Sequence, residues 1–108
     1  MIQPSTTTEV IPGIPAEAST RLLQRLGRCP RINAVWLYGS RAMGREHPGS
    51  DIDLCLDGPE LSHNDRLQLM AEIDDLLLPW SIDLALSSEL PDDLAAHVSR
   101  VGRCLWRR

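Results

Sequence analysis

Two aspartates separated by one residue are the feature of this sequence with the clearest chemical potential. Asp51 and Asp53 lie in the run DIDLCLD, in which aspartates and one cysteine alternate with isoleucine and leucine. Alternate side chains of a strand point to the same face, so both carboxylates are expected on one face, several ångströms apart. Such a pair can share one hard divalent cation or bracket two, which is what metal-assisted phosphoryl transfer requires.

A Gly-Ser pair upstream of these aspartates suits phosphate binding. Gly39 and Ser40 follow the apolar run AVWLY, and the spacing to the aspartates reads G-S-x10-D-x-D. Glycine lets backbone N–H groups approach a phosphate closely, and serine adds a hydroxyl. Arg41 and Arg45 are close enough in sequence to meet the remaining phosphate charge, although a solvated surface role fits them equally well.

A third aspartate occurs in a later strand-like run. Asp83 lies in SIDLAL, between Ile82 and Leu84. A carboxylate buried alone at this position would be strongly unfavourable, and a cation shared with Asp51 and Asp53 would remove that cost. This interpretation requires the two Asp-bearing strands to be neighbours. The alternative is a solvated aspartate on an edge strand.

The apolar pattern predicts the elements that must position these groups. Helical spacing predicts helices that begin near Ala16, after the N-cap Ser62 and near Pro91, with Asp65 completing a capping box. The predicted strands are 34–38, 51–57, 81–86 and 104–106. The Gly-Ser pair is expected to turn into a short helix. The order of elements predicts an α/β (α+β) fold, with a small mixed sheet and helices mainly on one face.

The bulk properties indicate a small cytoplasmic protein. Residues 1–15, rich in Thr, Pro and Gly, are expected to be a flexible lead-in, and residues 16–108 a single domain. A net charge of −4 argues against binding of long nucleic acid. The apolar runs are too short for a membrane span, and the N-terminus lacks the pattern of a signal peptide. His47, His63 and His97 are expected to be ordinary surface residues.

The run YGSRAMGREHPGSDIDLCL, followed by SIDLAL and a helix ending in VGRCLW, resembles the minimal nucleotidyltransferases (MNT) of the polymerase-β-like superfamily. It is most similar to the MNT antitoxins that accompany HEPN toxins, and the resemblance covers roughly residues 33–106. It implies the polymerase-β-like nucleotidyltransferase fold and a specific role for each motif residue. Under that implication the triphosphate of ATP binds to Gly39 and Ser40, and Arg41 assists with the phosphates. Asp51 and Asp53 would bind two Mg²⁺ ions, and Asp83 would bind one of them. Asp83 would also help to deprotonate the acceptor.

The resemblance further implies an antitoxin that transfers AMP from ATP to a tyrosine of a HEPN RNase toxin within a hetero-oligomer. Met43 departs from the family pattern, in which a basic residue is common at this position, so an arginine nearby must meet the phosphate charge. Two alternatives stay open. One is a non-catalytic antitoxin that neutralises a HEPN partner by stoichiometric contact. The other is a nucleotidyltransferase acting on a small-molecule acceptor, which the short chain disfavours because it leaves no room for an acceptor-binding domain.

Overall fold

A mixed β-sheet forms the centre of the molecule. The computed structural model describes residues 7–8 and 10–108, and the strands within this part are ordered β1–β5–β2–β3–β4. The strands are β1 (Thr7–Thr8), β2 (Ala34–Tyr38), β3 (Ile52–Asp57), β4 (Ile82–Leu86) and β5 (Arg103–Arg107). β3 and β4 pair in parallel, whereas the other pairings are antiparallel. The main predicted strands are confirmed to within one residue at each end, and the final strand is longer than predicted.

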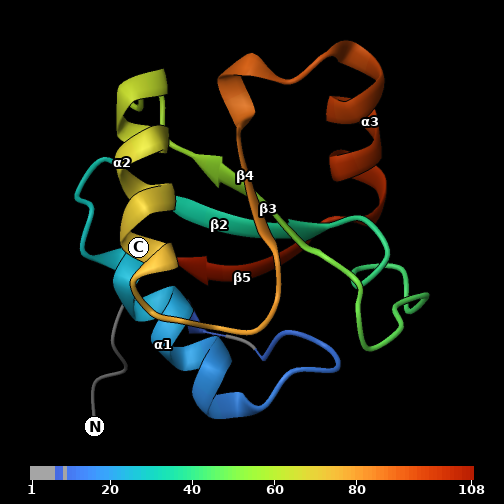
Figure 1. Ribbon diagram of the computed structural model, residues 1–108. Helices are drawn as coiled ribbons and strands as arrows, with labels where there is room; N and C mark the ends of the chain where they lie inside the picture. Colours follow the sequence, from blue (N-terminus) through green and yellow to red (C-terminus); the bar gives the residue numbers. More distant parts are fainter. Residues whose placement is uncertain (1–6, 9) are drawn as a thin grey trace, which may run out of the picture.

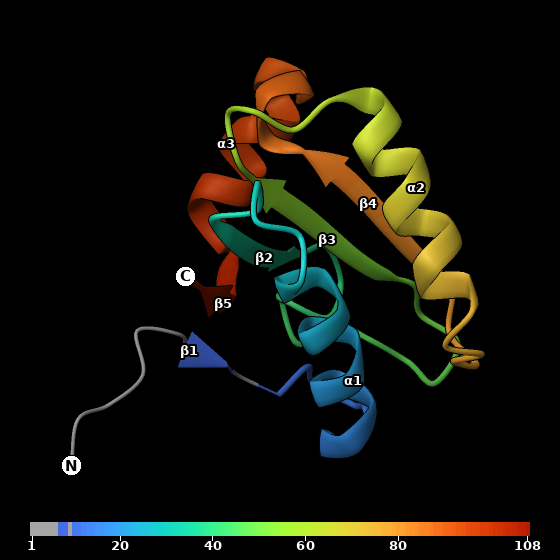
Figure 2. The ribbon, with the colours of Figure 1, turned by 90° about the vertical axis from the view of Figure 1, so that its left-hand side faces the viewer.

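The helices lie on both faces of this sheet. They are α1 (Ala16–Gly27), α2 (His63–Asp74) and α3 (Asp92–Val101), with a short 3₁₀ helix η1 (Ser87–Glu89) after β4. Figure 2 shows α1 and α2 on one side of the sheet and α3 on the other, and Figure 1 shows α3 apart from the α1–α2 pair. The predicted arrangement of helices mainly on one face is therefore confirmed. Within the described residues, no helix is long and apolar enough to cross a membrane.

The core lies between the sheet and the α1–α2 layer. Strand alternation places Ile52, Leu54 and Leu56 of β3 on this inner face, where each is at most 1% exposed. α1 contributes Leu22, Leu23 and Leu26, and α2 contributes Leu69 and Ile73. In contrast, α3 has no buried residue although one side of it is apolar. The alternate residues of β3, beginning with Asp53, face α3 rather than the core.

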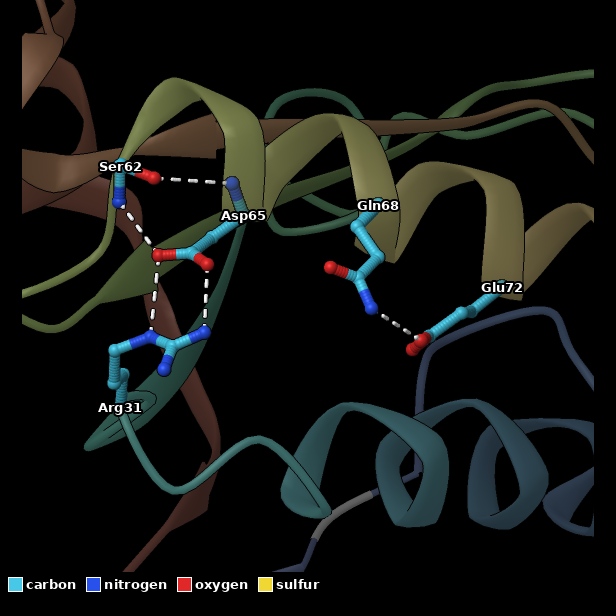
Figure 3. A network of polar contacts seen from close by, with 5 residues as sticks. All are labelled: Arg31, Ser62, Asp65, Gln68 and Glu72. Carbon is cyan, nitrogen blue, oxygen red and sulfur yellow. Dashed lines mark hydrogen bonds and ion pairs between the residues drawn. The ribbon is translucent and has the colours of Figure 1, made fainter.

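A capping box fixes the start of α2. The Ser62 hydroxyl accepts a hydrogen bond from the Asp65 backbone N–H at 3.1 Å, and the Asp65 carboxylate accepts one from the Ser62 N–H at 2.9 Å, as predicted. Arg31 also donates to Asp65, at 2.6 Å (Figure 3). The Ser62 backbone bond and then the Arg31 bond lower the pKa of the Asp65 carboxyl. The helix that joins β3 to β4 therefore begins at a defined residue.

Part of the predicted lead-in is attached to the rest of the fold. Residues 1–6 and 9 of the predicted lead-in lie outside the described residues. Thr7 and Thr8 pair with β5, and Ile11 and Ile14 are only 0% and 7% exposed. The Ile11 N–H also donates to the Ser19 hydroxyl at 3.0 Å. The two isoleucines of this segment therefore bury apolar surface in the core, and the flexible lead-in over residues 1–15 stays a prediction.

Candidate active site

The parallel pairing of β3 and β4 places two of the predicted aspartates side by side. Asp53 pairs in register with Asp83, on strands that run about 4.8 Å apart. Asp51 immediately precedes β3 and is exposed, as is Asp83, whereas Asp53 is half-buried. The requirement that the two Asp-bearing strands be neighbours is therefore met. β4 is also the edge strand of the sheet, so Asp83 is open to another molecule.

The electrostatics of these aspartates favour a bound cation. Burial raises the pKa of the Asp53 carboxyl above its ordinary value of 3.8, and the negative charges of Asp83 and Asp51 raise it further. His97 acts in the opposite direction and lowers that pKa. A divalent cation would relieve the repulsion that the Asp53 carboxylate experiences from Asp83 and Asp51, because it supplies positive charge beside them.

The donor chemistry of this site fits Mg²⁺, which prefers oxygen ligands. Within the described part of the chain, no three His, Cys, Asp or Glu side chains are grouped closely enough to hold a metal ion by themselves. Mg²⁺ commonly binds through one or two carboxylates and completes its shell with water and substrate phosphates, so a protein-only cage is not required. Binding of Mg²⁺ by Asp51, Asp53 and Asp83 stays a prediction.

Gly39 forms the turn that brings the Gly-Ser pair against these aspartates. Its φ is +76°, and a Cβ at this position would overlap the Asp53 carboxylate. The Gly39 and Ser40 carbonyls then accept hydrogen bonds from the N–H groups of residues 42, 43 and 45. These bonds form consecutive turns over residues 40–44, so the predicted short helix is absent there. Gly44, with a φ of +71°, departs from helical geometry and prevents the helix from continuing.

The two arginines of the motif loop differ in their surroundings. Arg41 is 1% exposed, and its guanidinium donates to the Pro12 carbonyl at 2.9 Å and to the Ser50 carbonyl at 2.8 Å. It therefore links the N-terminal segment to the residue before Asp51. Arg45 is exposed. Phosphate binding by both stays a prediction. Arg41 is buried, so a phosphate can reach its guanidinium only if the side chain or the segment that covers it moves.

Two further residues, which the sequence did not identify, line the same site. The Gly39 N–H donates to His97 Nε2 at 3.3 Å, and the His97 ring lies edge-on to Tyr38 with centroids 6.2 Å apart. Burial, followed by the charges of Asp83 and Asp53, raises the pKa of Tyr38 to about 12, so its phenol is neutral. Tyr38 lies beside Asp53 because the antiparallel register of β2 and β3 pairs these two residues. No local sequence pattern indicated His97, because its position depends on how α3 folds back over the sheet.

Comparisons with known proteins are consistent with this arrangement. The family model described as "Polymerase beta, Nucleotidyltransferase" matches residues 21–108. No curated protein matches the chain significantly.

Several solved toxin–antitoxin structures share the fold. One, a toxin–antitoxin with AMP-PNP, is 25% identical with a TM-score of 0.67, and the match covers 85% of this chain and 73% of that one. An MntA–HpeT toxin–antitoxin mutant is 22% identical with a TM-score of 0.69, covering 82% and 73%. A tri-AMPylated Shewanella oneidensis HEPN toxin in complex with MNT antitoxin gives 19% identity and a TM-score of 0.65, covering 85% and 71%. The fold predicted from the sequence motifs is thereby confirmed.

Proposed function

The chain belongs to the polymerase beta nucleotidyltransferase family, and from this premise we propose that it is a Mg²⁺-dependent transferase of AMP from ATP to a tyrosine of a HEPN toxin. Residues 16–108 form its single domain, and it acts as a cytoplasmic antitoxin. One observation carries the proposal. The Gly39 turn lies directly against Asp53, which pairs in register with Asp83 on the same sheet face.

Each motif residue has a role in this reaction. Gly39 and Ser40 bind the triphosphate, with Arg45 and a displaced Arg41 as further phosphate ligands. Two Mg²⁺ ions, held by Asp51, Asp53 and Asp83, would neutralise phosphate charge in the transition state. The acceptor oxygen forms a bond to the α-phosphorus, the bond from that phosphorus to the β-phosphate oxygen breaks, and pyrophosphate leaves. Asp83 takes part in removing the proton of the acceptor hydroxyl.

The proposed acceptor is a protein because the site is open at a sheet edge. Asp83 is exposed on β4, the edge strand, so a bulky acceptor can reach the carboxylates from outside the fold. The similar solved structures point to the kind of partner. They include a toxin–antitoxin with AMP-PNP and a tri-AMPylated HEPN toxin in complex with MNT antitoxin. We therefore propose a HEPN toxin as partner, in a hetero-oligomer.

The test is a transfer reaction with the purified proteins. The chain is incubated with Mg²⁺, ATP and its candidate HEPN partner, and the partner is then analysed by mass spectrometry for added AMP. Asp53→Ala should abolish the AMP increments, whereas Asp75→Ala, which removes an exposed carboxylate at the end of α2, should leave them unchanged. Fragmentation of the modified partner identifies the acceptor residue. Transfer that survives Asp53→Ala would sink the proposal.

The same reagents separate catalysis from simple binding. In the proposed function, the double variant Asp51→Ala/Asp53→Ala binds the toxin and leaves its RNase activity intact. If the double variant still silences the RNase fully, the chain is a stoichiometric binding module with an unused site. Transfer of AMP to an added small hydroxyl or amine compound, with none to the HEPN protein, would instead favour the small-molecule alternative.

A further inference from the structure

A pocket lies beneath α3, on the sheet face that carries Asp53. Its volume is about 350 Å³, within the range typical of small-molecule sites. Trp36 and Cys55, which are paired in register on β2 and β3, line it from the sheet. Ala95 and Val98 of α3 line it from above. The apolar side of α3, which buries no residue in the core, therefore faces a cavity next to the candidate active site.

The pocket lies next to the proposed phosphate and metal sites along strands β2 and β3. β2 and β3 are antiparallel, and Tyr38 pairs with Asp53. Gly39 lies just beyond that pair in one direction, and the Trp36–Cys55 pair lies two residues away in the other, a distance of about 7 Å along the strand. The order along the sheet is thus Gly39, Asp53, pocket. A nucleoside triphosphate has the same order of parts, namely terminal phosphates, α-phosphate and nucleoside.

The lining of the pocket suits a flat heterocycle. Trp36 is half-buried and offers an aromatic surface, and the Arg107 guanidinium lies 5.7 Å from its ring centroid. Stacking of bases on aromatic side chains is a common source of nucleotide affinity.

The rim of the pocket provides a hydrogen-bond acceptor. Asp57 lies at the end of β3 and is exposed, and its carboxylate accepts a hydrogen bond from the Ser87 hydroxyl at 3.3 Å. Carboxylates accept strongly from amino groups, and a base with an exocyclic amine is such a donor. A base that presents only a carbonyl at that position would place two acceptors against each other.

We infer that the pocket under α3 holds the base of the nucleotide, and that Asp57 selects a base with an exocyclic amine, such as adenine. The inference rests on the proposed function, because it assumes that the α-phosphate of the nucleotide lies at Asp53. It adds a nucleoside site to the phosphate site and gives a physical reason for the use of ATP.

Binding measurements test the pocket without relying on catalysis. Dissociation constants of ATP, ITP and inorganic tripolyphosphate are measured by calorimetry in the presence of Mg²⁺. ITP has a carbonyl in place of the exocyclic amine of ATP, and tripolyphosphate has no base. Ala95→Phe, at an exposed α3 position that lines the pocket, should weaken ATP binding by roughly tenfold, the scale of one lost stacking contact, and leave tripolyphosphate within twofold. Ala96→Phe, at the next exposed position, is the matched control and should change neither.

A second variant tests the role of Asp57. The unmodified protein should prefer ATP to ITP by about tenfold, as expected for a hydrogen bond to a charged group. Asp57→Ala should abolish this preference and leave tripolyphosphate binding unchanged. Equal affinities of the unmodified protein for ATP and ITP would overturn the assignment of Asp57.

The outcomes separate this inference from the proposed function. Equal affinity for ATP and tripolyphosphate, or ATP binding unaffected by Ala95→Phe, overturns the pocket assignment while AMP transfer to the partner can still be observed. Loss of transfer in Ala95→Phe with unchanged ATP affinity assigns the pocket to the acceptor and also overturns the inference. If the unmodified protein binds neither ligand, the proposed function fails together with the inference.

Discussion

At the scale of single residues, Gly39 meets two independent constraints. Its φ of +76° is unfavourable for any residue with a Cβ, and a Cβ would overlap the Asp53 carboxylate. We expect Gly39→Ala to lower the free energy of unfolding by about 1–2 kcal/mol, from the backbone term alone. Transfer activity should fall by much more than this loss of stability explains, because the Asp53 carboxylate must move. Urea denaturation and the AMP-transfer assay measure the two effects.

Gly44 provides the matched control for this variant. It has a similar φ of +71°, but a Cβ there would meet no atom within 4 Å. Gly44→Ala should therefore carry a comparable backbone cost and retain its transfer activity. If both variants lose activity equally, the contact between Gly39 and Asp53 is not what the reaction requires.

The raised pKa of Asp53 predicts a pH dependence of stability. The folded protein holds the Asp53 proton more tightly than the unfolded chain, so this group lowers stability as pH rises through and above 3.8. Asp53→Asn should therefore raise the free energy of unfolding at pH 7, by less than about 1 kcal/mol because the group is partly exposed and screened by solvent. The gain should vanish near pH 3. Denaturation curves at both pH values, without Mg²⁺, check it, and a variant less stable at pH 7 contradicts it.

The sequence was informative about those residues whose role depends on local spacing. The Gly39–Ser40 turn, the Asp51–Asp53 alternation and the Asp83 strand are readable without a structure, since strand period alone sets their directions. The burial of Arg41 was not readable, because it depends on carbonyls of Pro12 and Ser50 that close around it. His97 was missed for the same reason, since 58 residues separate it from Gly39.

At the scale of elements, the three helices differ in how they are anchored. α1 and α2 bury leucines and an isoleucine in the core, whereas α3 buries none and lies over a pocket. Amphipathic patterning predicted all three helices, yet it did not distinguish a helix packed on the core from one that covers a cavity. The short helix predicted after the Gly-Ser pair is replaced by turns for a local reason, because Gly44 takes a positive φ.

The anchoring of α3 predicts its backbone dynamics. Amide hydrogens of residues 92–101 should exchange faster than those of α1 and α2, because few buried contacts oppose local opening. His97→Ala removes the hydrogen bond to the Gly39 N–H and should speed exchange in α3 by roughly fivefold, the equivalent of about 1 kcal/mol. Hydrogen-exchange mass spectrometry checks this. His63→Ala, on α2, is the control and should leave α3 unchanged, and an equal effect of both variants would count against a specific anchor at His97.

At the scale of the whole molecule, charge makes nucleotide and cation depend on each other. The chain carries a net charge of −4, and three aspartates interact at the site where a polyanionic triphosphate must bind. Without a cation, ATP meets like charge at Asp53 and Asp83. With Mg²⁺ present, the ion neutralises both sides, so the two ligands should bind synergistically.

Thermal unfolding measures this synergy. A ligand at a hundred times its dissociation constant adds about 2.7 kcal/mol of stability, which for a domain of this size raises Tm by about 10 °C or more. We expect that shift with Mg²⁺ and ATP together, and only a small one with either alone. Asp53→Asn should weaken the synergy for two reasons: the amide is a poorer ligand for the ion, and the loss of a negative charge lets ATP bind better without Mg²⁺. Asp75→Asn should preserve the synergy. A full shift with ATP alone would mean that the backbone N–H groups and arginines bind the phosphates without a metal ion, so the aspartates would need another explanation.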